Sequence, residues 1–516
     1  MADHRSSFVS RHLLPLTLFL TTFTLYAFTA PAGLTWDLGG ADGGEFATAV
    51  YTGGLVHSPG YPTYLLFAQI VHLIPLPSFA HRLNLFSALC MSLSCLVFWH
   101  TAALRQPNEQ KSRPHSLTTA VALSFFATAP LVWSQAIMTE VYALATLFSA
   151  VILYQIFLID IKITLKQTTG HSWSTDLYAT SFLLAIGLGA HFFVGLTAVF
   201  ALLYLGQPPQ FRKNLTLPDL LRSAFCFGIG LTVFAYLPLR AGQVPASNWG
   251  DPDSWSNFWW VVSGQAYSGR FSWSHLNTFG GAVWRTLTDN LGIAGFLLAC
   301  IGLATWWEKN RRLLIAASSV IILNIIWVAG YNSADILPYL LPSLMLLTLA
   351  IALITTNKEI HKQTQRFIRP FTIGAIGIII ANIYLGLGGI NTVTTGADQY
   401  GRQITQTLPP QSAVITQSTA ETFALRYARI ITNPQTEIVH IDPNLYQWAW
   451  YRDDLAKQYP HVSFPLDDPH FDNWLQQLSR DNPQLTLYIT APETTAHPIT
   501  YNSQLNLYQL NIDRTN

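Results

Sequence analysis

Long runs with almost no charged side chain are the feature that most constrains this chain. No residue from Leu13 to Trp36 or from Leu83 to Leu104 is charged, and between Ser116 and Ile159 only Glu140 is charged. A helix needs roughly 20 apolar residues to cross the hydrocarbon core of a bilayer. Only 11% of the 516 residues are charged, against about a quarter in a typical soluble domain. These runs exclude a soluble enzyme, a disordered chain and a porin-like barrel, whose strands would alternate.

Basic segments between the apolar runs set the predicted topology, because loops rich in Lys and Arg stay on the cytoplasmic side of a membrane. Residues 61–77 form a short segment with three prolines. Prolines break helices, so we expect this segment to lie on the outer face rather than to span. The basic segments then all fall inside: 105–113, 162–166, 212–222, 309–312 and 358–369.

The predicted fold is a polytopic α-helical membrane protein with about 11 transmembrane helices and a cytoplasmic N-terminus. The first run is interpreted as a retained anchor rather than a signal peptide, because it is long and further spans follow it. The predicted spans are 13–31, 82–104, 117–134, 139–160, 176–190, 192–206, 222–239, 291–307, 313–331, 336–355 and 371–390. A chain of this kind, with a net charge of +1, gives no reason to expect nucleic-acid binding.

Three regions are predicted to lie outside: loop 31–81, loop 240–290 and the tail. Residues 1–390 form the transmembrane module, and residues 391–516 differ from it in composition. In the tail, short strand patterns alternate with helical patterns, which predicts a small extracytoplasmic α/β domain. The predicted strands are 412–417, 436–441, 485–489 and 505–511, and the predicted helices are 419–431, 444–459 and 471–480.

The first outer loop carries the strongest chemical pattern, Asp42-Gly-Gly-Glu45. Residues three apart share a face of a helix, and paired carboxylates can supply a general base and its charge partner. The same spacing is also that of a capping box, with Asp42 as the N-cap and Glu45 at the third helical position. Both interpretations stay open from the pattern alone, although the glycines would permit close approach of a ligand.

Other candidate residues fall on the same predicted membrane face, and each has a structural alternative. Glu140 is costly to bury unless it is paired or wet, but an acid can also snorkel to the interface. Arg240 can clamp a phosphate or anchor its helix end. Asp251 can bind substrate or only cap a turn. The remaining candidates are His57, His191, Tyr331 and Asp335.

These stretches together resemble a known family. The signatures are D-x-G-E at 42–45, H-x-P-G-Y-P at 57–62 and N-W-G-D-P at 248–252. They are similar to the bacterial multispanning relatives of the eukaryotic transmembrane O-mannosyltransferase that modifies plexin-type domains. The resemblance extends over nearly the whole chain. Gly43 and Ser58 depart from it, where serine and proline would be expected.

The resemblance implies a GT-C type glycosyltransferase, which moves a sugar from a polyprenyl-phosphate donor in the bilayer to an acceptor hydroxyl on the outer face. Mannose is the expected sugar, and a protein or an envelope glycan is the expected acceptor. It implies Asp42 as the catalytic base, with Glu45 and Glu140 as further catalytic residues. Arg240 and His57 would bind the donor phosphate, and the predicted substrate-binding residues are His191, Asp251, Tyr331 and Asp335.

Three questions stay open from the sequence. A divalent cation could be held by the oxygens of Asp42, Glu45 and Glu140, or the reaction could need no metal. A transporter or lipid-linked glycan flippase would also place acids in a membrane protein, although usually near the midplane and with internal repeats. A membrane scaffold that uses the tail as a binding module is the third alternative. The expected location is the bacterial cytoplasmic membrane.

Overall fold

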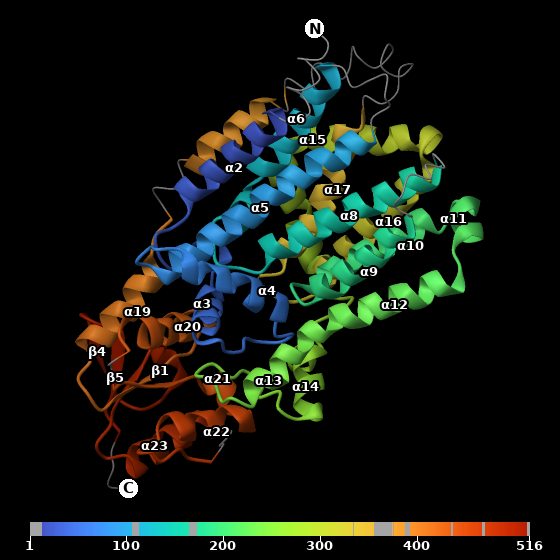
Figure 1. Ribbon diagram of the computed structural model, residues 1–516. Coiled ribbons are helices and arrows are strands. Elements are labelled where there is room, and N and C mark those ends of the chain that lie inside the picture. Colours follow the sequence, from blue (N-terminus) through green and yellow to red (C-terminus); the bar gives the residue numbers. More distant parts are fainter. Residues whose placement is uncertain are drawn as a thin grey trace.

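The computed structural model describes residues 13–105, 113–164, 173–333, 335–354, 374, 376–387, 393–434, 437–466 and 470–512. It is a long bundle of helices with the tail domain packed against one end (Figure 1). The main helices of the bundle are α2 (Leu14–Thr29), α5 (Phe79–Leu104), α6 (Arg113–Thr128), α7 (Pro130–Ala136), α8 (Tyr142–Thr164), α9 (Trp173–Leu188), α10 (Leu196–Leu205), α12 (Leu217–Leu231), α15 (His275–Lys309), α16 (Arg311–Gly330) and α17 (Leu341–Ala352).

The apolar segments predicted from the sequence are mainly helical where they are described. Among the described residues, five helices are long and apolar enough to cross a membrane. A sixth candidate is the pair Thr119–Thr128 and Pro130–Ala136, which bends by 65° because proline interrupts the helical hydrogen bonds. Five shorter apolar helices complete the set, and one of them is Ile376–Leu387. The protein is therefore a multi-pass membrane protein, while the total of 11 spans stays a prediction.

The segment predicted to lie on the outer face is short in the structure. It forms α4 (Pro62–Phe67) and the 3-10 helix η3 (Ala68–Leu73), which together are shorter than a span requires. The predicted basic loop 358–369 and parts of the loops 105–113 and 162–166 lie outside the described residues.

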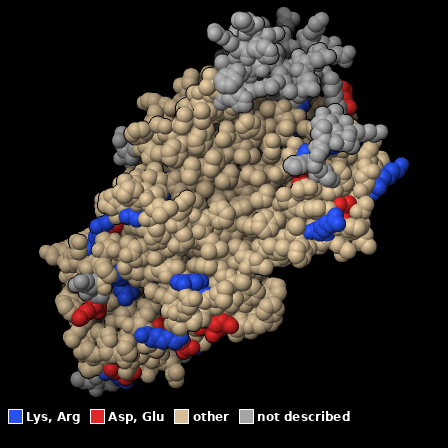
Figure 2. Space-filling model, in the orientation of Figure 1, with Lys and Arg blue, Asp and Glu red and all other residues tan. Residues whose placement is uncertain are grey.

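On the face shown in Figure 2, charged side chains lie mainly toward the two ends, with a broad uncharged band between them. At the end away from the tail, Asp160 of α8 is buried among cations. It accepts hydrogen bonds from Arg105 at 2.8 Å, from Arg312 at 2.8 and 3.1 Å, and from Tyr204 at 2.7 Å. Both guanidinium groups also lie over the ring of Tyr204. This cluster joins the ends of helices α5, α8, α10 and α16.

The tail forms one five-stranded mixed sheet with helices around it. The strand order is β2-β1-β3-β5-β4, in which β1 is parallel to both β2 and β3, and β5 is antiparallel to β3 and β4. The strands are β1 (Ser412–Ile415), β2 (Val439–Ile441), β3 (Thr486–Ile489), β4 (Ile499–Asn502) and β5 (Leu507–Leu510). The helices are α19 (Gly396–Thr407), α20 (Thr419–Tyr427), α21 (Pro443–Tyr446), α22 (Ala449–Gln458) and α23 (Phe471–Asp481). The predicted α/β pattern is thus confirmed, while the sequence prediction missed β4 and α19.

The tail packs directly on the first outer loop through helices α3 (Gly43–Thr52) and α20. Gly44 makes this contact possible, because a Cβ there would lie 2.4 Å from the carbonyl oxygen of Phe423. The indole of Trp36 donates to the carbonyl of Ala420 at 3.1 Å. The sequence had suggested that glycines here permit close approach of a ligand, but Gly44 instead permits close approach of another helix.

The second outer loop also reaches the tail, through a cluster of four tryptophans. Trp249 stacks on Trp260 of α14 (Trp255–Val262) with 5.2 Å between ring centroids. Trp450 lies 5.4 Å from Trp249, and Trp448 lies 4.9 Å from Trp260. Both outer loops and the tail therefore meet at one end of the bundle (Figure 1).

Candidate active site

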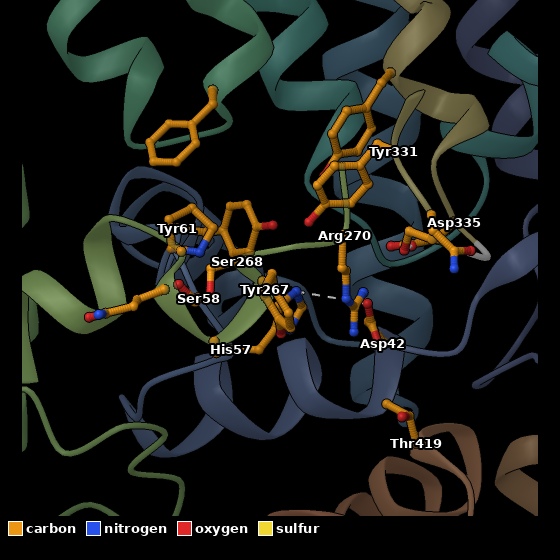
Figure 3. Close-up of a pocket in the computed structure, with 18 of the residues that line it drawn as sticks. Asp42, His57, Ser58, Tyr61, Tyr267, Ser268, Arg270, Tyr331, Asp335 and Thr419 are labelled. Carbon is orange, nitrogen blue, oxygen red and sulfur yellow. Dashed lines mark hydrogen bonds and ion pairs between the residues drawn. The ribbon is translucent and has the colours of Figure 1, made fainter. Parts of the chain in front are cut away.

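A cavity of about 1610 Å³ lies where the helix ends, the two outer loops and the tail meet. One side of its wall is apolar and comes from the bundle, with Phe192, Leu196 and Trp327. The opposite side comes from the tail and includes Phe423 and Trp448. Figure 3 shows polar side chains from both outer loops pointing into the space between. The predicted site residues that line the cavity are Asp42, His57, His191, Tyr331 and Asp335.

The capping box considered for the first outer loop does not form. Asp42 occupies the N-cap of α3, but its side chain makes no capping hydrogen bond. Glu45 is fully buried, and its carboxylate faces His57 instead of the helix N-terminus. Asp42 is therefore free to face the cavity from the positive end of a helix.

Glu45 and Asp42 hold His57 between them. One Glu45 oxygen accepts from the backbone N–H of His57 at 3.0 Å, and the other lies 2.5 Å from Nδ1 of its ring. Nε2 of the same ring lies 3.9 Å from the Asp42 carboxylate. The three residues form a row that leads from the buried interior of α3 to the cavity wall.

The electrostatics of this row follow from burial and from neighbouring charges. Burial raises the pKa of Asp42 to about 6, with Asp335 and Glu45 adding to the effect and His57 and Arg270 opposing it. Burial disfavours the charged form of His57, yet Glu45 and Asp42 outweigh it and raise the pKa of that imidazole to about 10. At neutral pH, His57 is therefore a cation and Asp42 is mostly ionised.

The turn that carries His57 is fixed by its sequence. Gly60 has φ of +89°, a conformation that other residues adopt only with strain. A Cβ there would also meet the side chain of Leu237 at 2.9 Å. The backbone N–H of Gly60 donates to the carbonyl of His57 at 2.9 Å, which closes the turn. The H-x-P-G-Y-P signature thus sets the direction of the imidazole.

Arg270 is the main site residue that the sequence analysis missed. Its guanidinium lies over the ring of Tyr267, 4.5 Å from the centroid, and it lines the cavity. It lies beside Asp42 and His57 in Figure 3. No motif marks this arginine, and its position depends on a bridge between Phe271 and Tyr331, which are distant in sequence.

Arg240, the predicted phosphate clamp, is not among the residues that line the cavity. Its guanidinium donates to the carbonyls of Thr52 and Gly53 at the C-terminal end of α3. A cation at this end of a helix is favourable for the helix dipole. The structure therefore gives Arg240 a place that holds the helix bearing Asp42, rather than a place in the cavity.

Asp251 and Glu140 also lie outside the cavity lining. The carboxylate of Asp251 accepts from the amide of Asn248 at 2.8 Å, which is the turn geometry considered as its alternative. Glu140 is buried in the bend between α7 and α8, where its carboxylate accepts from the N–H of Val141 at 3.3 Å. It acts on the site through its charge, which raises the pKa of His57.

His191 and Asp335 combine local structural bonds with positions on the cavity wall. Nδ1 of His191 accepts from the N–H of Phe193 at 3.1 Å, and its ring stacks on Tyr61 at 5.9 Å. Asp335 accepts a hydrogen bond from Ser333. Tyr331 stacks on Trp327 with 5.6 Å between centroids.

The cation considered for Asp42, Glu45 and Glu140 does not fit this arrangement. Within the described parts of the chain, no three His, Cys, Asp or Glu side chains are grouped to hold a metal ion. Both oxygens of Glu45 are already bonded to His57. We therefore derive no step that depends on a metal.

Comparisons with known proteins identify relatives of this chain by sequence and by fold. Residues 42–212 match the family model described as the protein O-mannosyl-transferase TMEM260 N-terminal domain. The mouse protein O-mannosyl-transferase TMEM260 is 23% identical over 480 residues, which cover 87% of this chain and 65% of the mouse protein. The chain thus spans less than two thirds of the length of this relative.

Solved structures match the whole fold. ArnT from Cupriavidus metallidurans in the apo state gives a TM-score of 0.59 at 12% identity, over 96% of this chain and 97% of ArnT. The same protein bound to undecaprenyl phosphate gives a TM-score of 0.53 at 13% identity, over 97% and 98% of the two chains. The resemblance drawn from the sequence is confirmed: the chain is similar in sequence to the protein O-mannosyl-transferase TMEM260 and has an ArnT-like fold.

Proposed function

We propose that this protein is a membrane glycosyltransferase that moves a sugar, expected to be mannose, from a polyprenyl-phosphate donor to an acceptor hydroxyl. The observation that carries the proposal is the position of Asp42. Its carboxylate lines a cavity of about 1610 Å³ and lies beside a single arginine, between apolar helix ends and a polar tail. The mouse protein is named a protein O-mannosyl-transferase and ArnT binds undecaprenyl phosphate, and both support the same reaction class.

The apolar side of the cavity is suited to the lipid donor. Phe192 and Trp327 line the cavity, and both side chains are exposed rather than packed in the bundle core. These aromatic surfaces would pack against the apolar polyprenyl chain of the donor. Arg270 would bind the donor phosphate, because a guanidinium forms strong paired hydrogen bonds to phosphate oxygens. This assignment replaces the earlier expectation for Arg240.

Asp42 would supply the base. An acceptor hydroxyl is a poor nucleophile until a carboxylate takes its proton. In the proposed step the acceptor oxygen bonds to the anomeric carbon of the sugar, and its proton passes to Asp42. The bond from that carbon to the phosphate oxygen breaks, and the lipid phosphate leaves with the electron pair. Arg270 would stabilise the negative charge that grows on this leaving group.

The acceptor would bind on the tail side of the cavity. Among the described residues that line the cavity, Arg270 is the one Lys or Arg. A strongly anionic acceptor would need further cations, because phosphate groups are usually bound by several donors. Thr419, Asn444 and Trp448 instead offer hydroxyl, amide and aromatic groups. These groups favour a neutral acceptor, and we propose a serine or threonine of a protein.

The proposed setting is a bacterial cytoplasmic membrane, with the N-terminus inside and the site and tail outside. A donor panel in purified membranes tests the function. Polyprenyl-phosphate mannose and other polyprenyl-phosphate sugars, each labelled in the sugar, would be offered with and without acceptor peptides. Label on a peptide supports the transferase. Label crossing the membrane on an intact donor would indicate a flippase or transporter, and no change in the label would indicate a scaffold.

A further inference from the structure

Glu45 and His57 are joined by two separate contacts, although one hydrogen bond would be enough to link α3 to the following turn. A carboxylate that is fully buried normally needs a cationic partner. Glu45 uses both of its oxygens on His57, at 3.0 Å to the backbone N–H and 2.5 Å to Nδ1. This bonding fixes the ring so that Nε2 faces Asp42. The second nitrogen therefore presents its proton to the cavity carboxylate.

The distance between Nε2 of His57 and the Asp42 carboxylate determines what kind of contact they make. At 3.9 Å, Nε2 and the Asp42 oxygen form an ion pair without a short hydrogen bond. A positive charge at this distance keeps a nearby carboxylate ionised, while the lone pairs of that carboxylate stay available to another proton donor. The Asp42 side chain is 18% exposed, so a substrate hydroxyl in the cavity can reach it.

We propose that Glu45 and His57 act as a fixed positioning pair, in which Glu45 keeps the imidazole protonated and the imidazolium keeps Asp42 ionised and able to accept the substrate proton. This inference rests on the proposed role of Asp42 as the base. His57 is then a partner of Asp42 rather than a ligand of the donor phosphate, and Glu45 acts only through His57.

Several other charges face Asp42, and they divide by sign. Glu45 of its own helix and Asp335 of the segment before η8 (Leu337–Leu340) favour the protonated form of Asp42, as burial does. Arg270 of the second outer loop favours the ionised form, together with His57. Glu140, in the bend before α8, adds negative charge beside His57. His57 lowers the pKa of Asp42 more strongly than Arg270 does. Removing the His57 charge should therefore change the ionisation of Asp42 more than removing that of Arg270.

The test follows the ionisation of Asp42 in the full-length protein, read by the infrared carbonyl band that Asp42→Asn removes. In the wild type we expect the band to appear as the pH falls through about 6. His57→Gln removes the positive charge and should raise the proton affinity of Asp42 about tenfold or more, which is a shift of about one pH unit or more. Glu45→Gln should shift it in the same direction but less, because it also removes a negative charge near Asp42.

Asp335→Asn is the matched control, since it removes a carboxylate that faces Asp42 without touching His57. It should move the midpoint toward lower pH, opposite to the other two variants. His57→Asn provides a second variant should the glutamine side chain disturb the turn. Unchanged midpoints in the His57 and Glu45 variants would overturn the proposal, because a merely structural pair alters folding and not the affinity of Asp42 for a proton.

A second reading comes from the pH dependence of kcat/KM with polyprenyl-phosphate mannose. The acid limb should move to higher pH in His57→Gln, with activity recovering at alkaline pH. A uniform loss at every pH would contradict the pairing. Should the wild type transfer no sugar from any donor, the proposed function fails, while the infrared titration still decides whether the pair controls Asp42.

Discussion

Two aspartates at opposite ends of the bundle show how the same side chain can be used in two ways. Asp160 accepts hydrogen bonds from two arginines and a tyrosine, all between 2.7 and 3.1 Å. Asp42, within the described part of the chain, forms one ion pair, with His57 at 3.9 Å. Asp42 lines the cavity between the bundle and the tail, whereas Asp160 is not among the residues that line it. A carboxylate whose oxygens all accept hydrogen bonds, such as Asp160, holds helices together. A carboxylate with oxygens left open to a cavity, such as Asp42, is available for chemistry.

The largest effect is expected for Asp42→Asn. Asparagine keeps the size of the side chain and remains a good N-cap, so folding should be normal. It cannot take a proton from a hydroxyl, and turnover should fall by ~100-fold or more. Initial rates of sugar transfer, normalised to folded protein by size-exclusion chromatography, provide the measurement. Near-wild-type transfer would show that Asp42 serves only the helix terminus.

Asp160→Asn should reverse this pattern. Removing the carboxylate leaves the half-buried guanidinium groups of Arg105 and Arg312 without their anion, and breaking a buried ion pair usually costs about 3 kcal/mol or more. We expect a lower thermal midpoint and less folded protein in membranes, with nearly unchanged turnover per folded molecule. An Asp160→Asn protein that is as stable as the wild type but transfers no sugar would contradict the purely structural role of Asp160.

Arg270 and Arg240 have different expected roles: Arg270 binds the donor phosphate, and Arg240 stabilises the end of α3. Arg270→Gln should raise the KM for the lipid donor by about tenfold or more, because a hydrogen bond to a charged group contributes ~1.5–3 kcal/mol. Arg240→Gln should leave this KM unchanged and cost about 1 kcal/mol of stability through the lost bonds at the end of α3. Donor titrations with both variants measure the difference. A raised KM in Arg240→Gln with an unchanged KM in Arg270→Gln would show that Arg240, and not Arg270, binds the donor phosphate.

The smallest effect concerns the contact between α3 and the tail. Gly44→Ala would place a Cβ 2.4 Å from the Phe423 carbonyl oxygen, and overpacking of this kind costs ~1–3 kcal/mol. Limited proteolysis should then release the tail more readily. Gly43→Ala is its control, since a Cβ there meets its nearest neighbours at an ordinary 3.5 Å. Equal protease sensitivity of both variants would contradict the proposed docking role.

The sequence predicted what depends on local pattern. Charge-free runs marked the helices, and strand periodicity marked most of the sheet. Asp42, His57, His191, Tyr331 and Asp335 were predicted as site residues, and the structure places all five in the cavity wall. The family resemblance added a reaction class that no composition could provide. These signals lie within short stretches, so they can be recognised before any contact is known.

The remaining features depend on contacts between distant segments. Arg270 enters the cavity because residues 271 and 331 form a bridge, and nothing near it in sequence predicts that bridge. Arg240 follows a predicted span, as a phosphate clamp would, but its guanidinium donates to the carbonyls at the end of α3. Glu45 fits a capping box by spacing, yet the stronger partner is a histidine twelve residues later.

The most direct test of the central claim is to follow both products of one reaction in proteoliposomes. Polyprenyl-phosphate mannose and a peptide with a serine or threonine would be supplied on the tail side. Glycosyl transfer predicts equal amounts of free polyprenyl phosphate and mannosylated peptide, both nearly absent with Asp42→Asn. Release of polyprenyl phosphate that is unchanged in Asp42→Asn, or labelled donor crossing the membrane without release, would contradict the assignment of Asp42 as the base of a glycosyltransferase.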